Sequence, residues 1–100
     1  MPQAIDNNTL MITGGWSDYT RNETHIFSTK TQQWSKGPTL NQGRRLHGCG
    51  RVKIGNKKIA LVTGGWNGWY GGKLSSVELI DLDDINGKWT NGWNSNFHLV

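Results

Sequence analysis

Histidine and cysteine are the residue types of this 100-residue sequence that most readily act as nucleophiles or metal ligands. His25, His47 and His98 are far apart, with no H-x-x-x-H spacing and no paired cysteines, so no metal site is predicted. Cys49 follows His47 by two residues, which on a strand places both on one face, as a thiol nucleophile and its base would require. The flanking glycines instead favour tight packing. We therefore expect no enzyme activity, no metal and no cofactor.

Aromatic and charged residues in glycine-rich segments are better candidates for binding. Trp69 and Tyr70 lie within the segment 67–72, which contains three glycines and is too glycine-rich to bury them easily. Exposed aromatic residues on a loop held by a rigid scaffold are typical binding hot spots, whereas the alternative is that they fold back over a strand edge. The full set of predicted partner-binding residues is Asp18, Tyr19, Arg21, Arg44, Arg45, Trp69, Tyr70 and Lys73.

The two adjacent arginines allow a structural interpretation as well. Arg44 and Arg45 precede a predicted strand, and Glu23 and Glu78 stand at the start of two others. An ion pair between one arginine and one glutamate would fix one strand against another. Alternatively, the arginines face an open channel and meet an acidic ligand.

An internal repeat positions these residues. Each copy contains an apolar run, a Thr-Gly-Gly-Trp motif, a second apolar segment and a further Trp, in that order. The first copy has them at 10–12, 13–16, 24–27 and Trp34, and the second has them at 59–62, 63–66, 77–80 and Trp89. The motif recurs after fifty residues, which is typical of repeat architectures built from one small unit.

The second copy predicts four short strands. They are expected within 44–54 (most clearly at 50–54) and at 57–63, 76–82 and 88–93, and Gly55-Asn56 forms a tight hairpin turn between the first two. The run Ile59–Val62 is continuously apolar rather than alternating, which implies burial on both faces of its sheet. Four short strands per unit, covered on both sides, are typical of a β-propeller blade.

The order apolar run, Gly-Gly, Val-Glu, Asp, Trp resembles the kelch repeat. The second copy carries the resemblance at Arg45, 59–62, Gly64-Gly65, 76–78, Asp81 and Trp89, and the first at Gly14-Gly15, Phe27, Trp34 and Pro38. The resemblance implies an all-β fold of two four-stranded antiparallel kelch blades of an incomplete propeller. The blades are expected at 1–42, with the innermost strand missing or short, and at 43–96, and residues 97–100 are expected to begin a following segment.

The repeat also assigns structural roles. Gly14-Gly15 and Gly64-Gly65 end the second strand of each unit, where a positive φ or a close backbone approach excludes a Cβ. A phosphate-cradling loop is the alternative, but it requires a following helix, and none is predicted. Trp34 and Trp89 are expected to pack within or between blades rather than to act as stacking platforms, and Glu78 completes the structural set.

Strand connectivity predicts which loops act together. In an antiparallel unit, the loop between the second and third strands and the segment leading to the next unit emerge at the same end. The segments 17–23, 37–43 and 67–73 are therefore expected to be neighbours, forming a rim of loops. Kelch-type propellers commonly bind protein partners on such a rim, in some cases to recruit substrates to a ubiquitin ligase.

Composition supports a compact β-structure. Glycine contributes 14 residues and tryptophan 6, and no apolar run is long enough to span a membrane or form a signal peptide. The net charge of +4 is scattered, so neither nucleic acid nor membrane is expected as a partner. The single cysteine favours a reducing compartment, and we expect a cytoplasmic location.

We expect a protein-interaction scaffold that needs further blades, from the same gene or an oligomer, to close a ring. A carbohydrate-binding or galactose-oxidase-like propeller fragment is the alternative, although the copper ligands of such oxidases are not matched here. A non-functional fragment is a third interpretation, and it would aggregate when expressed alone.

Overall fold

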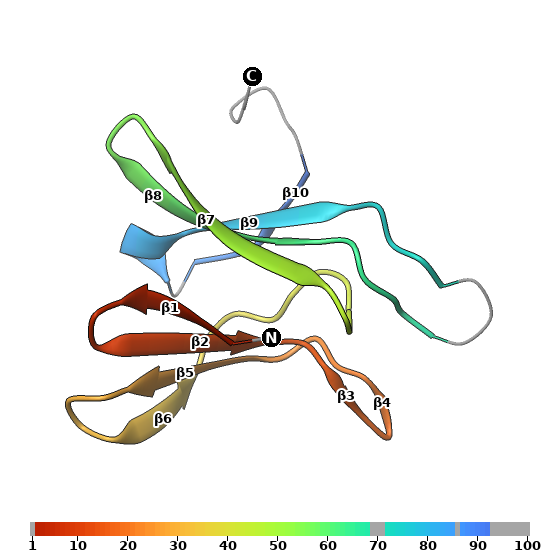
Figure 1. Cartoon of the computed structure of the whole chain (residues 1–100), viewed down its shortest axis with the longest axis horizontal. Coiled ribbons are helices and arrows are strands. Elements are labelled where there is room, and N and C mark those ends of the chain that lie inside the picture. The colour runs from red at the N-terminus through yellow and green to blue at the C-terminus, as the bar shows by residue number, and fades with distance from the viewer. Residues whose placement is uncertain (1, 69–71, 86, 93–100) are drawn as a thin grey trace.

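The computed structural model describes residues 2–68, 72–85 and 87–92. Strands make up most of the regular structure of these residues, and their helical structure is limited to the single 3-10 turn η1 (Leu82–Asp84). The described chain forms two four-stranded antiparallel sheets, as the sequence predicts (Figure 1). No helix in this part of the chain has the length and apolar character needed to cross a membrane.

The first sheet has the order β1-β2-β5-β6. Its strands are β1 (Pro2–Asp6), β2 (Thr9–Thr13), β5 (Thr24–Ser28) and β6 (Gln33–Lys36). The innermost strand, expected to be missing or short, is present as the five residues of β1 and pairs with β2.

The second sheet has the order β10-β9-β8-β7. Its strands are β7 (Gly48–Ile54), β8 (Lys57–Thr63), β9 (Val77–Asp81) and β10 (Thr90–Asn91). The bounds of β8 are those predicted. The two-residue turn before this strand is also present, and Gly55 adopts φ 61 in it. The fourth strand is shorter than the predicted 88–93 within the described residues.

The two sheets repeat the same pairing. Thr13 lies opposite Thr24 in the first sheet, and Thr63 lies opposite Val77 in the second. The Thr-Gly-Gly-Trp motif therefore leaves both sheets at the same point of the same strand, which explains why loops of different sequence begin alike.

The hydrophobic core lies between the sheets. Its buried members are Met11, Leu40, Ala60, Val62, Ile80 and Trp89, with Ile5, Ile26, Cys49 and Leu82 packed against them. Three residues of the continuous apolar run in β8 are fully buried, and the fourth, Leu61, is half-buried. Because alternate side chains of a strand point to opposite faces, β8 is covered on both sides for most of its length.

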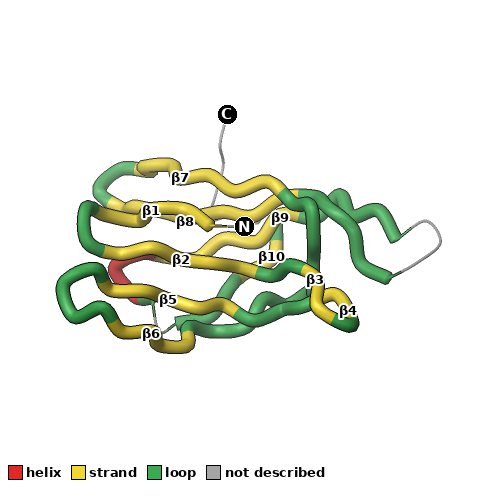
Figure 2. Tube along the Cα trace, turned by 60° about the horizontal axis from the view of Figure 1, so that its bottom comes forward, coloured by secondary structure: helices red, strands yellow, loops and turns green. Residues whose placement is uncertain are grey.

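The two ends of the sheets differ. The turns β1–β2, β5–β6 and β7–β8 gather at one end, and the longer loops after β2 and β8 gather at the other (Figures 1 and 2). The first of these loops contains a small ribbon that sequence analysis did not predict, formed by β3 (Trp16–Ser17) and β4 (Tyr19–Thr20). Asp18 makes the turn between these strands with φ 65, a conformation that aspartate tolerates better than most residues.

Candidate functional site

The three loops predicted to be neighbours are joined by hydrogen bonds at the loop end of the sheets. Asn67 donates from Nδ2 to the Gly43 carbonyl at 2.7 Å. The backbone N–H of Gly68 donates to the Thr20 hydroxyl at 3.3 Å. One bond thus ties the loop of the second sheet to the linker between the sheets, and the other ties it to the loop of the first. We call the surface formed by the described residues 15–23, 43, 45–46, 65–68 and 72–73 the loop rim.

Each diglycine closes its loop in the same way. Gly14 N donates to the Glu23 carbonyl at 2.9 Å, and Gly64 N donates to the Ser76 carbonyl at 3.0 Å. No α-helix follows either diglycine, since the described residues contain none, so the phosphate-cradle alternative has no support. The diglycines hold the strand ends and define where the loops begin.

Gly14 and Gly65 also permit close backbone approach. Their φ angles are 60 and 89, and a Cβ on either residue would overlap a backbone carbonyl, that of Arg44 for Gly14 and that of Arg45 for Gly65. The segment entering the second sheet therefore runs directly against both diglycines. A side chain at either position would push this segment away.

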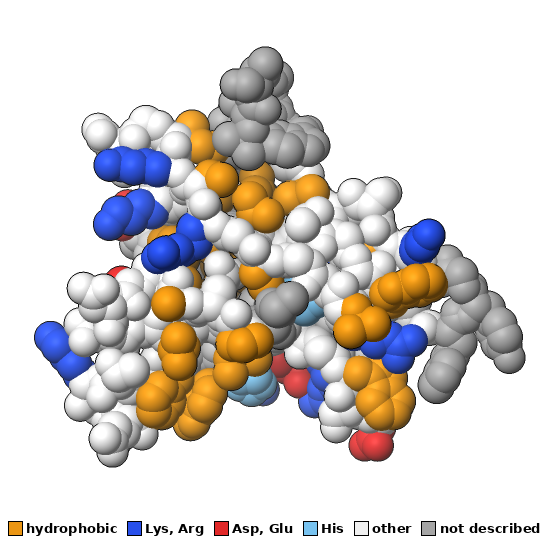
Figure 3. All heavy atoms as spheres, viewed as in Figure 1, with side chains coloured by type: hydrophobic (Ala, Val, Ile, Leu, Met, Phe, Trp, Pro, Cys, Tyr) orange, Lys and Arg blue, Asp and Glu red, His pale blue; other side chains and the backbone are white. Residues whose placement is uncertain are grey.

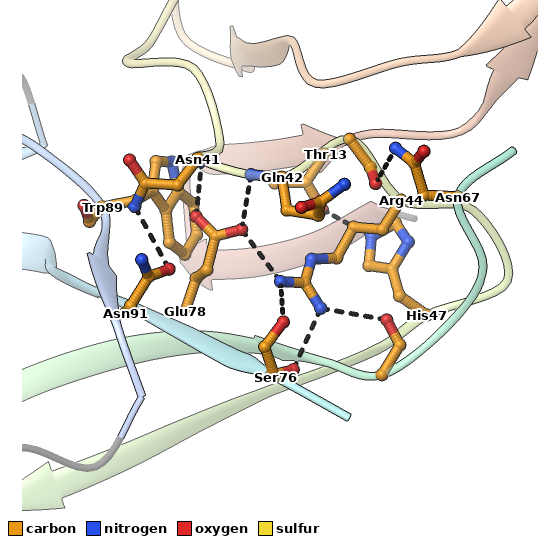
Figure 4. Close-up of polar contacts among 12 residues, drawn as sticks. Thr13, Asn41, Gln42, Arg44, His47, Asn67, Ser76, Glu78, Trp89 and Asn91 are labelled. Atoms are coloured by element: carbon orange, nitrogen blue, oxygen red, sulfur yellow. Dashed lines mark hydrogen bonds and ion pairs between the residues drawn. The ribbon is translucent and has the colours of Figure 1, made fainter. Parts of the chain in front are cut away.

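Arg44 is not a rim residue, and its assignment to partner binding is wrong. Its side chain is fully buried and pairs with Glu78, with 2.9 Å between Nη2 and Oε2 (Figure 4). Nη1 donates at 3.0 Å to the carbonyls of both Gly64 and Ser76. Arg44 thus fixes the start of the second sheet internally, which is the structural interpretation left open by the sequence.

Glu78 connects this ion pair to the linker between the sheets. Its carboxylate accepts from the backbone N–H groups of Asn41 at 2.6 Å and Gln42 at 3.1 Å. Trp89 ties down the same linker, because its Nε1 donates to the Pro38 carbonyl at 3.0 Å and its own carbonyl accepts from Asn41 Nδ2 at 2.9 Å. Glu78 and Trp89 therefore hold the first unit against the second.

Trp34 packs on its own sheet but is not buried. Its side chain is 57% exposed and rests on Phe27, with ring centroids 4.9 Å apart. In the second sheet, by contrast, the linker between the sheets covers Trp89.

The pair of His47 and Cys49 lacks the properties of a catalytic dyad. His47 Nε2 lies 3.0 Å from the Thr13 hydroxyl, and that hydroxyl lies 3.9 Å from Cys49 Sγ, so threonine stands between the two. Burial lowers the pKa of His47 to about 4 and raises the pKa of the Cys49 thiol. At neutral pH the thiol stays protonated and the imidazole neutral, which is the opposite of an activated thiolate.

The exposed part of the loop rim is aromatic and cationic. Trp16, Tyr19 and Leu46 have exposed fractions of 51%, 57% and 83%. The guanidinium of Arg21 lies 4.3 Å from the ring centre of Tyr19 and forms an ion pair with Glu23 at 2.6 Å. This stack holds an aromatic ring in place while leaving much of it open to solvent.

A hollow of about 680 Å³ lies beside this stack. Gly15, Trp16, Arg45, Leu46 and Trp66 line it. Arg45 is anchored by donating to the Gly68 carbonyl at 3.1 Å, and its backbone pairs in both directions with that of Trp66. The hollow therefore has apolar walls and a guanidinium at its edge.

Lys73 lies beside the same hollow. Its ammonium nitrogen is 5.9 Å from the ring centre of Trp66, and the two residues form a β-bridge. Of the predicted partner-binding set, Asp18, Tyr19, Arg21, Arg45 and Lys73 lie on the loop rim. Trp69 and Tyr70 lie outside the described residues, as do His98 and the segment 97–100.

Sequence reasoning did not include Leu46, Trp16 or Trp66 among the partner-binding residues. Leu46 adopts φ 52, which turns the chain between two buried neighbours, Arg44 and His47. Leu46 lines the same hollow as Trp16 and Trp66, and contiguous exposed apolar surface of this kind marks interaction sites. The signal in the sequence was an isolated leucine among basic residues. No three His, Cys, Asp or Glu side chains gather to hold a metal within 2–68, 72–85 and 87–92.

No family model matches the chain, and no curated protein matches it.

Proposed function

We propose that this chain is a kelch-type interaction scaffold that binds a protein partner through the loop rim. The observation that carries the proposal is the exposure of Trp16, Tyr19 and Leu46 together, at one end of two firmly held sheets. Tryptophan, tyrosine and arginine are the residues most enriched in binding hot spots. A fixed surface rich in these side chains suits a protein partner.

The framework under the rim supports the same proposal. The buried pair Arg44–Glu78 and the hydrogen bond from Asn67 to Gly43 hold the loops before any partner arrives. A binding surface that is already ordered loses less conformational entropy on association than a mobile one. The residues with structural roles thus serve the binding surface indirectly.

The uncovered face of the first sheet supports a larger assembly. Leu10 and Trp34 are 37% and 57% exposed there, and Figure 3 shows hydrophobic side chains gathered over β2, β5 and β6. The equivalent residues of the second sheet, Ala60 and Trp89, are buried because the first unit covers them. We propose that another four-stranded sheet of the same kind covers this face.

The test of the loop rim compares two variants with the wild-type chain. Trp16→Ser combined with Leu46→Ser removes two exposed apolar side chains from the rim. Lys30→Ser combined with Gln33→Ser alters exposed residues of the first sheet at the opposite end and is the control. We expect a partner captured by the wild-type chain, then purified and titrated directly, to bind the control unchanged and the rim variant at least about tenfold more weakly.

Equal affinity of that purified partner for all three chains would contradict the proposal. So would saturable quenching of tryptophan fluorescence by an oligosaccharide, lost on Trp16→Ser, with no protein partner bound. That second outcome would favour the carbohydrate-binding alternative.

A further inference from the structure

A second hollow, of about 500 Å³, lies at the turn end of the sheets, away from the loop rim. The β1–β2 turn borders it on one side and the β7–β8 hairpin on the other. Its apolar floor is formed by Ile5 and Leu82, both half-buried. Ile5 and Leu82 also pack against the core between the sheets, so the floor is continuous with a rigid part of the molecule.

Three positive charges stand at this hollow. Arg51, Lys53 and Lys58 line it, and Lys53 lies directly opposite Lys58 in the β7–β8 pairing. Arg51 lies opposite Ala60, a core residue, so all three cations share the face of the second sheet that is turned toward the first. Figure 3 shows basic side chains gathered over this hairpin.

This arrangement does not stabilise the hairpin. Like charges directly opposite each other on paired strands repel, so the Lys53–Lys58 pair costs stability. The single carboxylate in the hollow, that of Asp6, accepts from the backbone N–H of Asn8 at 2.7 Å, and this bond and nearby Lys58 lower its pKa. Three cations and one carboxylate leave a net charge of +2 at the mouth of an apolar hollow.

Arg51 is held across the two sheets. Its Nη1 donates to the Ile5 carbonyl of β1 at 3.1 Å, which uses one of the five N–H donors of the guanidinium. The planar guanidinium suits the paired oxygens of a phosphate or sulfate group, and ammonium groups add charge without directional demand. The hollow thus combines the guanidinium of Arg51, held in place by its hydrogen bond, with two lysine ammonium groups and an apolar floor.

We propose that this hollow binds a small anion in which a phosphate or sulfate group is attached to an apolar body. The cations neutralise the anionic group, and the floor of Ile5 and Leu82 contacts the apolar body. The site is separate from the loop rim, and its test is independent of the protein-binding proposal.

Three probes separate the two parts of the proposed recognition. Phenyl phosphate carries both the charge and the apolar body, inorganic phosphate carries the charge alone, and phenol carries the ring alone. We expect phenyl phosphate to bind saturably, at least about tenfold more tightly than either of the others, in a titration followed by backbone amide NMR shifts. The shifts should centre on Arg51, Val52 and Lys58.

Single substitutions test whether phenyl phosphate binds in this hollow. Lys58→Gln should weaken phenyl phosphate binding about tenfold, and Arg51→Gln should do the same where circular dichroism shows that it is folded. Lys30→Gln, which removes an exposed lysine elsewhere, should leave the affinity unchanged.

Three results would overturn the proposal. One is phenol binding as tightly as phenyl phosphate, which would leave an apolar hollow without anion recognition. Another is non-saturable shifts spread over all basic residues, Lys30 included, which would indicate charge screening only. The third is binding of a long acidic polypeptide that is insensitive to Lys58→Gln, with no binding of phenyl phosphate.

Discussion

Trp34 and Trp89 occupy the same position in the two sheets and have opposite environments. Each stands three residues before a glycine, Gly37 or Gly92, whose N–H donates to the first residue of the third strand. Trp89 is 3% exposed, because the linker from the first sheet lies over it, whereas Trp34 is 57% exposed. The molecule thus contains one covered and one uncovered example of the same sheet face.

Replacing these two tryptophans should have very different effects on stability. Trp89→Ala removes a buried indole and the hydrogen bond to Pro38, and we expect a loss of about 3–5 kcal/mol. Trp34→Ala removes a largely exposed ring and should cost less than about 1 kcal/mol. Urea unfolding of the two variants measures both values. Equal losses would show that the chain alone already covers Trp34.

The buried ion pair gives the second prediction. Glu78→Gln leaves the Arg44 guanidinium uncompensated at a site from which water is excluded, and we expect a loss of about 3–5 kcal/mol. Arg44→Met combined with Glu78→Met removes both charges. This double variant should recover only part of the loss, because the N–H groups of Asn41 and Gln42 lose their acceptor.

The single variants Arg44→Met and Glu78→Met, the double variant and the wild type form a cycle whose unfolding free energies isolate the pair. Additive losses from the two single variants would contradict a direct coupling of Arg44 and Glu78. Arg45→Met is the matched control, because Arg45 is the adjacent arginine and lies on the rim.

Much of the strand pattern was predictable because it depends on local features. The Gly55-Asn56 turn fixes the hairpin, and the apolar run of β8 identifies a strand buried on both faces. The sequence does not show which of two adjacent arginines is buried and which is exposed. Arg44 is buried against Glu78 and Arg45 lies on the rim, and tertiary packing decides which of the two adjacent side chains turns inward.

Features of the loop rim were also missed, because they depend on tertiary structure rather than on the local sequence. Leu46 is exposed because its φ of 52 turns it away from the sheet, and nothing in its own sequence neighbourhood requires that conformation. The missed ribbon of β3 and β4 has strands of two residues, too short for any alternation to be visible. Nor does the sequence show that Trp89 is covered by the linker between the sheets while the equivalent Trp34 is 57% exposed.

The burial of His47 predicts a specific pH dependence. Its pKa is about 4 in the folded chain, lowered mainly by desolvation, against 6.5 when exposed. Below pH 6.5 the unfolded chain therefore takes up a proton that the folded chain does not, and stability falls as the pH falls toward 4. Between pH 7 and pH 4.5 the resulting loss of stability is on the order of 2 kcal/mol.

The measurement is urea unfolding at several pH values between 7 and 4.5. His47→Gln should be less stable than wild type at pH 7, and this difference should shrink as the pH falls, because the variant has no such proton to take up. A constant difference across the range would mean that His47 does not titrate on unfolding.

The diglycines provide the last prediction, since two glycines of similar conformation differ in their surroundings. Gly15 and Gly65 both have positive φ, 103 and 89, and each costs about 1–2 kcal/mol when replaced by alanine for this reason alone. A Cβ on Gly15 meets nothing within 4 Å, whereas one on Gly65 overlaps the Arg45 carbonyl and contacts His47. Gly65→Ala should therefore cost at least about 1 kcal/mol more than Gly15→Ala in thermal or urea unfolding.

Gly65→Ala should also weaken partner binding at the rim, because Arg45 and Leu46 must move outward to admit the methyl group. Equal stability of the two variants would indicate that the second sheet tolerates a shift of its entering segment, and the close approach would then have no structural role.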